Sequence, residues 1–193
     1  MEERDFDEIE AAPDVKNSRP NDIKAIIYDW VKTILLAVVL AFFVRTTIVG
    51  AYFVPTGSMK PTIGIGDRLL GVKFLYWFAE PERGDIVVFE PPPSAHSDVP
   101  RYVKRVVAVE GDIIEVHHGT LYVNGEPVNE PYASPPHYRL STREVPPSSL
   151  FVLGDNRNNS ADGHVWGFLP KENVEAKIIF RFWPLTRAGK LAK

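Results

Sequence analysis

The longest apolar stretch of the chain begins at Ala25 and reads AIIYDWVKTILLAVVLAFFV. Its second half, Thr33–Val44, has no charged residue, whereas Asp29 and Lys32 lie three positions apart nearer its beginning. A helix needs about 20 apolar residues to cross a bilayer, and charged side chains near one end of such a helix reach the interface. The pattern therefore predicts one N-terminal transmembrane helix, with residues 25–45 as the membrane anchor.

Two other interpretations of this stretch are a buried helix in a soluble core and a cleaved signal peptide. A core helix is disfavoured because Thr33–Val44 is apolar all round and follows a polar N-terminus. A cleaved signal peptide is disfavoured because Arg45-Thr46-Thr47 stands where a small-x-small cleavage pattern is expected. An uncleaved anchor is the interpretation that fits best.

The segment before the anchor, residues 1–24, is polar and acid-rich. Such a segment buries too little apolar surface to offset the entropy of ordering, so we expect a disordered tail. Few basic residues follow the expected helix closely, whereas four precede it: Arg4, Lys16, Arg19 and Lys24. Because basic residues favour the cytoplasmic side, the tail is predicted to be cytoplasmic and the remainder extracytoplasmic.

Beyond the anchor, short runs of β-branched and aromatic residues alternate with Gly- and Pro-rich turns. Eight strands are expected, at Thr46–Val54, Arg68–Val72, Asp85–Glu90, Tyr102–Glu110, Ile113–Val116, Thr120–Val123, Leu150–Leu153 and Val174–Phe182. Asn124-Gly125 is typical of a tight hairpin turn. Two proline-rich stretches, residues 91–100 and 129–147, are interpreted as loops.

The expected fold class is therefore mostly β: an antiparallel β-sheet core with an inserted β-hairpin subdomain, preceded by one transmembrane helix. The core is assigned to residues 46–111 and 150–185, the inserted subdomain to 112–149, and a C-terminal tail to 186–193.

Composition narrows the possible functions. The 193 residues are 45% apolar and carry a formal net charge of −3, so no basic excess indicates a nucleic-acid partner. The absence of cysteine excludes disulfides, thiolate metal sites and a cysteine nucleophile. Seventeen prolines and thirteen glycines favour a loop-rich β architecture over a helical bundle.

The first candidate for chemistry is Ser58, which lies between Gly57 and a Met-x-Pro turn in the segment Val54–Thr62. A sharp turn can display a serine hydroxyl as a nucleophile. Serine between Gly and Pro is more often an ordinary turn residue, so this segment alone leaves both interpretations open.

A second block, residues 102–108, places Lys104 and Arg105 next to each other within an apolar strand. Successive side chains on a strand face opposite sides, so one of the two must point inward. The alternative is a charge that protects an exposed strand edge. Burial lowers the pKa of a lysine, and the neutral amine can then serve as general base for a serine.

Histidine is the more usual base in such a site, and the chain has five: His96, His117, His118, His137 and His164. Four of them lie in expected loops or in the inserted subdomain. His164 directly follows the polar block described next, although a surface role is the simpler interpretation.

A third block, Gly154–Asp162, groups Asp, Asn, Arg and Ser after an expected strand. A calcium loop is disfavoured because Arg157 and Ala161 interrupt the alternation of oxygen ligands. A solvated turn and a loop that orients a catalytic lysine remain as alternatives.

These blocks in this order resemble bacterial-type signal peptidase I, a membrane-bound serine protease with a Ser–Lys dyad. The matching segments are the apolar anchor, Gly57-Ser58-Met59-x-Pro61-Thr62, Gly66-Asp67, Gly84-Asp85-Ile86-Val87, Lys104-Arg105-Val106-Val107, Gly111-Asp112, and Gly154-Asp155-Asn156-Arg157-x-Asn159-Ser160-x-Asp162. Together they extend over residues 25 to about 185.

The resemblance implies roles for individual residues. Ser58 would be the nucleophile and Lys104 the general base, with Thr56 and the Ser58 backbone N–H as the oxyanion hole. Ser160 would hydrogen-bond the lysine amine, and Asp162 would support that loop through a nearby cation.

The sequence departs from the family pattern after Asp162, where Gly163-His164 stands in place of Ser-Arg. The cation expected beside Asp162 is therefore either Arg105 or a protonated His164.

The resemblance also implies the substrate, an extended segment at the end of a secretory signal peptide with small residues at positions −1 and −3. The residues expected to line its pockets are Tyr52, Val54, Pro55, Met59, Tyr102 and Val103. Signal peptides and the lipid bilayer are the implied partners, with no nucleic acid, no metal and no cofactor. The implied location is the plasma membrane or a thylakoid-type membrane.

Two further functions are less well supported. A self-cleaving Ser–Lys protease of the repressor type is disfavoured by the anchor and by the lack of a DNA-binding segment. A non-catalytic peptide-binding β domain would be expected if Ser58 or Lys104 were replaced, and both are present.

Overall fold

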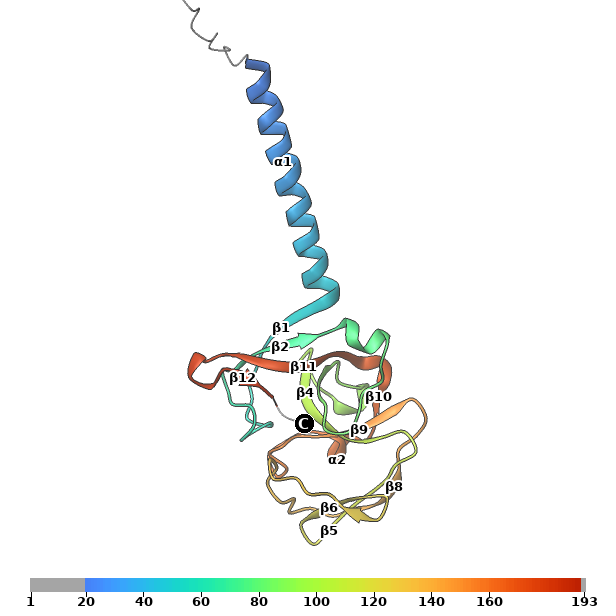
Figure 1. Ribbon diagram of the computed structural model, residues 1–193. Helices are drawn as coiled ribbons and strands as arrows, with labels where there is room; N and C mark the ends of the chain where they lie inside the picture. The colour runs from blue at the N-terminus through green and yellow to red at the C-terminus, as the bar shows by residue number, and fades with distance from the viewer. Residues whose placement is uncertain (1–19, 192–193) are drawn as a thin grey trace, which may run out of the picture. The chain divides into compact units, whose positions relative to one another are not determined.

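The computed structural model describes residues 20–191 and divides the chain after Phe42 into two compact units. The first contains most of helix α1 (Pro20–Phe43), which Figure 1 shows in blue. The helix begins five residues earlier than predicted, because Pro20 suits the first position of a helix. Residues 20–24, assigned to the disordered tail, are thus helical, and residues 1–19 of that tail lie outside the described part.

Helix α1 forms most of residues 23–48, a segment long and apolar enough to cross a membrane, in which an 18-residue stretch has a mean hydropathy of 2.0. Within the protein its large apolar side chains stay more than half exposed. By its length and composition, α1 is therefore a candidate membrane-spanning helix.

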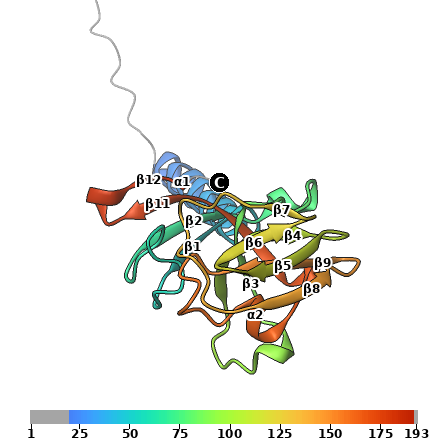
Figure 2. The same cartoon turned by 90° about the horizontal axis from the view of Figure 1, so that it is seen from below.

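The second unit, residues 43–191, consists of two antiparallel sheets (Figures 1 and 2). The larger sheet has the order β1-β2-β11-β3-β4-β9-β10, with β12 paired to β11. Its strands are β1 (Val49–Phe53), β2 (Arg68–Val72), β3 (Ile86–Phe89), β4 (Tyr102–Val109), β9 (Ser149–Leu153), β10 (Leu169–Pro170), β11 (Val174–Trp183) and β12 (Gly189–Lys190).

The smaller sheet has the order β7-β6-β5-β8. Its strands are β5 (Ile113–His117), β6 (Thr120–Val123), β7 (Glu126–Pro127) and β8 (Leu140–Glu144). All four come from the part of the sequence assigned to the inserted subdomain. Asn124 and Gly125 connect β6 to β7 with positive φ angles of 56° and 80°, as a type I′ turn requires.

Short helical segments connect these strands. They are the π-helical η1 (Val44–Ile48), the 3₁₀ helices η2 (Phe74–Trp77), η3 (Pro93–Ala95), η4 (Lys171–Asn173) and η5 (Leu185–Arg187), and the α-helix α2 (Gly163–Trp166).

The mostly β antiparallel fold class is confirmed, and three local predictions are wrong. The strand expected from Thr46 begins only at Val49, because Thr46 and Thr47 donate their hydroxyls to the Phe43 carbonyl and prolong the helical turn. Strand β8 lies in the stretch interpreted as a proline-rich loop. The expected C-terminal tail contains β12, and Arg187 forms an ion pair with the buried Asp67.

Candidate active site

Ser58 lies in the loop between β1 and β2, which is closed by hydrogen bonds at its base. The Val54 N–H donates to the Asp67 carbonyl (3.0 Å), and the Gly66 N–H donates to the Val54 carbonyl (2.9 Å). Inside the loop, Met59 and Ile63 are fully buried. Burial of these two side chains in the apolar core therefore anchors the part of the loop that follows Ser58.

A second segment, residues 154–156, packs directly against the backbone of Ser58. The Asn156 N–H donates to the Ser58 carbonyl (3.0 Å), and the Asn156 side-chain amide donates to the Gly57 carbonyl (3.2 Å). A Cβ on Gly154 would lie 2.4 Å from the Ser58 carbonyl oxygen, so only glycine permits this approach.

Lys104 projects from the middle of β4 toward this turn and is only 4% exposed. Its Nζ donates to Ser58 Oγ (2.8 Å) and to the Val103 carbonyl (3.1 Å). Burial lowers the pKa of Lys104 from 10.5 to about 8, although the negative charges of Asp162 and Asp155 oppose the shift. A substantial neutral fraction of the amine is therefore present near neutral pH, in contact with a serine hydroxyl.

Two further predicted site residues, Thr56 and Ser160, differ in whether they contact Ser58 or Lys104. Thr56 Oγ1 lies 3.4 Å from Ser58 Oγ, within hydrogen-bond distance. Ser160 Oγ is buried, and among residues 20–191 it has no hydrogen-bond partner. The expected hydrogen bond from Ser160 to Lys104 is therefore not formed, since Lys104 donates to Ser58 and Val103 instead.

Asp162 supports its loop through backbone groups and His164. Its Oδ2 accepts from the Gly154 N–H (2.8 Å), while its Oδ1 accepts from the His164 N–H (3.2 Å) and lies 2.7 Å from His164 Nδ1. The His164 ring in turn stacks on Tyr138, with centroids 4.1 Å apart. Of the two side chains expected beside Asp162, His164 contacts it.

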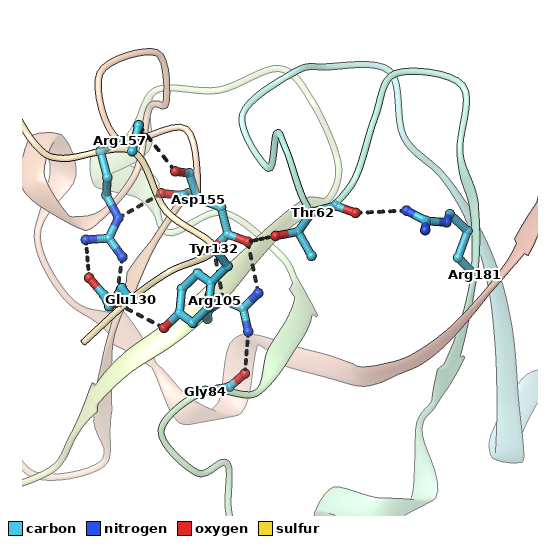
Figure 3. Close-up of polar contacts among 10 residues, drawn as sticks. Thr62, Gly84, Arg105, Glu130, Tyr132, Asp155, Arg157 and Arg181 are labelled. Carbon is cyan, nitrogen blue, oxygen red and sulfur yellow. Dashed lines mark hydrogen bonds and ion pairs between the residues drawn. The ribbon is translucent and has the colours of Figure 1, made fainter. Parts of the chain in front are cut away.

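Arg105 is fully buried and forms a two-bond ion pair with Asp155 (Figure 3). Nε and Nη2 donate to the two carboxylate oxygens of Asp155 at 2.9 Å each, and Nη1 donates to the Gly84 carbonyl at 3.0 Å. Asp155 also accepts from the hydroxyl of Thr62, in the Ser58 loop, at 2.5 Å. This network links the strand of Lys104 to the loop of Ser58.

Asp155 and Arg157 lie in the polar block Gly154–Asp162, and neither had a predicted role of its own. Arg157 pairs with Glu130 through both carboxylate oxygens (2.7 Å each), and Tyr132 from the same segment stacks on Arg105, 3.9 Å from ring centroid to Cζ. Figure 3 shows these groups side by side. Several charged residues within one short motif indicated that a network of ion pairs exists. They did not indicate which residue pairs with which.

A cleft of about 620 Å³ opens at Ser58 and Lys104. It is lined by all six residues predicted to contact substrate: Tyr52, Val54, Pro55, Met59, Tyr102 and Val103. Thr56 and Ser160 also line it, as do several residues that the sequence did not indicate, among them Val88 and Arg101. Within the described range, no group of three or more His, Asp or Glu side chains is arranged to hold a metal ion.

The family model of signal peptidase, peptidase S26, matches residues 27–183. The chain belongs to this family. It is 42% identical to signal peptidase I of Leptolyngbya laminosa, covering 86% of this chain and 84% of that one. Its identity to probable signal peptidase I-2 of Synechocystis is 44%, covering 83% and 75%.

Two further relatives come from other lineages. Thylakoidal processing peptidase 1 of Arabidopsis thaliana is 37% identical, covering 88% of this chain and 52% of that one. The crystal structure of a signal peptidase I from Enterococcus faecalis V583 aligns with a TM-score of 0.44 and 30% identity, covering 51% of this chain and 97% of that one. The family and its members make this signal peptidase a hydrolase, a serine protease of the class that removes signal peptides.

Proposed function

We propose that this signal peptidase cleaves secretory preproteins after small-x-small sites, with Ser58 as nucleophile and Lys104 as general base. The observation that carries the proposal is the 2.8 Å contact between Lys104 Nζ and Ser58 Oγ, made by a lysine that is 4% exposed. No other group is needed to explain how the hydroxyl loses its proton.

The reaction follows from this contact. The neutral amine of Lys104 takes the Ser58 proton as Oγ attacks the carbonyl carbon of the scissile bond. The resulting ammonium returns the proton to the leaving amine, which departs as the new N-terminus of the mature protein. Lys104, neutral again, takes a proton from water as the water oxygen attacks the carbonyl carbon of the acyl-enzyme ester. The ammonium then returns this proton to Ser58 Oγ as the ester C–O bond breaks, which releases the signal peptide.

Thr56 and the Ser58 backbone N–H would stabilise the negative oxygen of each tetrahedral intermediate. Thr56 supports this role because its hydroxyl already lies at hydrogen-bond distance from the nucleophile. Asp162 would fix the loop that packs against Ser58 through the Gly154 N–H, and Arg105 would support the site through Asp155.

The cleft suits an extended peptide lying between β1 and the segment that leads into β4. Its walls carry apolar and aromatic side chains, so a bound strand would place alternate side chains against them. Small groups at −1 and −3 would suit walls that include the buried apolar side chains of Met59 and Val54.

The helix α1 would hold the enzyme at the membrane where signal peptides are themselves embedded, which raises their effective concentration. The basic residues preceding α1 support a cytoplasmic N-terminus and an extracytoplasmic catalytic domain. A plasma membrane or a thylakoid-type membrane would satisfy this arrangement, and thylakoidal processing peptidases are among the relatives.

The pH dependence of cleavage tests the role of Lys104. Because only the neutral amine can act as base, kcat/KM on an Ala-x-Ala preprotein is expected to rise about tenfold per pH unit below the Lys104 pKa of about 8, and to level off above it. The full chain in detergent should be assayed from pH 5.5 to 9.5. A profile that stays flat over this range would rule out Lys104 as the base.

Replacing Thr56 by valine removes the hydroxyl and keeps the shape of the side chain. We expect kcat to fall about 10²- to 10³-fold with little change in KM, because an oxyanion donor acts in the transition state. Thr56→Ser should retain most of the activity as the matched control. Unchanged kcat in Thr56→Val would remove Thr56 from the oxyanion hole.

A further inference from the structure

Glu175, near the start of β11, contacts both walls of the cleft. Its Oε1 accepts from the Tyr52 hydroxyl (3.1 Å) on β1, and its Oε2 accepts from Arg101 Nε, directly before β4. Lys73 Nζ lies 3.0 Å from the same Oε1. Tyr52 and Arg101 both line the cleft, so a single carboxylate connects its two sides.

The Tyr52 ring lies flat over two glycines that are paired across strands β1 and β2. A Cβ on Gly50 would lie 2.6 to 2.8 Å from the Tyr52 hydroxyl and ring, and a Cβ on Gly71 would lie 2.7 Å from the same ring. Any side chain at these positions would push the ring out of this recess. The glycines therefore admit the ring to this recess, and Glu175 ties its hydroxyl to Arg101 on the other wall of the cleft.

The position of Arg101 indicates which part of a substrate passes this point. Arg101 precedes Lys104 by three residues along the wall that leads into β4, a distance of about 10 Å in extended chain. A substrate strand covers the same distance in three residues. If the carbonyl of residue −1 lies at Ser58, the substrate residues level with Arg101 are two to three positions before −1, at −3 and −4. Of these, −3 shares the face of −1, because successive side chains of a strand alternate.

We propose that Glu175 is a positioning residue which sets the width of the cleft at the −3 side chain by holding Tyr52 and Arg101 together. This inference rests on the proposed function and adds to it the structural reason why −3 must be small. Glu175 itself makes no contact with the dyad and acts through the two residues it holds.

The charge of Glu175 is maintained by its neighbours. Partial burial would raise its pKa, but hydrogen bonds from Arg101 and Lys73 outweigh this effect and hold the pKa below its usual range. Glu175 is thus ionised at neutral pH, and its bonds to Arg101 and Tyr52 are charge-assisted, the stronger class of hydrogen bond.

The test compares Glu175→Ala with wild type on four preproteins: Ala, Val or Leu at −3 with Ala at −1, and Leu at −1 with Ala at −3. A wider cleft should raise kcat/KM for Leu at −3 relative to Ala at −3 about tenfold, the usual effect of a methylene-sized change in a pocket. Discrimination against Leu at −1 should not change. Equal changes at both positions, or none at −3, would overturn the proposal.

Matched variants separate positioning from general damage. Glu172→Ala removes an exposed carboxylate three residues earlier and should leave −3 selectivity unchanged. Gly50→Ala should displace the Tyr52 ring into the cleft and shift selectivity the opposite way, penalising Val at −3. Tyr52→Phe removes only one hydroxyl, so it tests the proposal even if Glu175→Ala folds poorly. It should relax −3 selectivity in the same direction as Glu175→Ala. No relaxation in Tyr52→Phe would count against the proposal.

Different outcomes would contradict the proposed function and the role of Glu175. If Ser58→Ala cleaves any of these preproteins, the proposed function is wrong. If wild type cleaves them with a preference for small −3 residues and Glu175→Ala keeps that preference, only the role of Glu175 is wrong.

Discussion

Replacing Lys104 by methionine is expected to make the enzyme inactive and, at neutral pH, more stable. Methionine keeps an unbranched side chain of similar length and lacks the amine. Loss of the base should lower kcat/KM on an Ala-x-Ala preprotein by a factor of about 10³ to 10⁶, since members of a catalytic pair act as a unit. The kcat/KM of Ser58→Ala should fall to the same level, and the double variant should be no less active than either single variant.

The gain in stability has its origin in the buried charge. The pKa of Lys104 lies at about 8 in the folded protein against 10.5 when exposed, so below pH 8 the folded state holds an ammonium that it disfavours. This shift corresponds to a cost on the order of 3 kcal/mol, partly offset by about 1 kcal/mol for the hydrogen bond to Ser58. The free energy of unfolding of Lys104→Met should therefore exceed that of wild type below pH 8.

The sign of the pH dependence distinguishes this cause from better packing. As pH rises from 8 to 10.5, the wild-type lysine becomes neutral in the folded state first, so wild type gains stability and the advantage of Lys104→Met shrinks. Denaturation of the full chain in detergent at pH 6.5 and 9.5 measures the difference. Lys60→Met, at an exposed lysine in the Ser58 loop, should leave the free energy of unfolding unchanged at both pH values. A gain in stability for Lys104→Met that is independent of pH would contradict the charge argument.

Much of the candidate site could be predicted from the sequence because its signals are local. The alternation of side chains in residues 102–108 requires that Lys104 or Arg105 faces inward, and the turn at Ser58 is defined by its neighbours Gly57 and Pro61. Both lysine and arginine are in fact buried, because the sheet curls and each face of β4 is covered.

The partner of Arg105 could not be predicted because it depends on strand register. Arg105 pairs with Leu153 across β4 and β9, so the carboxylate two residues beyond Leu153, that of Asp155, lies beside the guanidinium. Shifting the register would offer a different residue, and nothing in the sequence distinguishes Asp155 from Asp162. Strand β8 was missed for a related reason, since its pairing with β5 outweighs the prolines around it.

Arg105→Met is expected to destabilise the protein by about 3 to 5 kcal/mol, because it leaves the fully buried Asp155 charge without its partner. For a chain of this size the melting temperature should fall by roughly 6 to 20 °C. The matched control is Arg83→Met at the pair with Asp112, whose arginine is 46% exposed and whose loss should cost under about 1 kcal/mol. A cost for Arg105→Met no larger than this control would show that the buried pair does not stabilise the fold.

Combining Arg105→Met with Asp155→Leu separates stability from catalytic geometry. An apolar pair of similar volume removes the uncompensated charge, so most of the lost stability should return. Asp155 also accepts the hydroxyl of Thr62 in the Ser58 loop, and leucine cannot replace that hydrogen bond. The double variant should therefore be folded and still cleave slowly, with kcat reduced more than KM is raised. Recovery of full kcat would show that the loop keeps Ser58 in place without the Thr62–Asp155 contact.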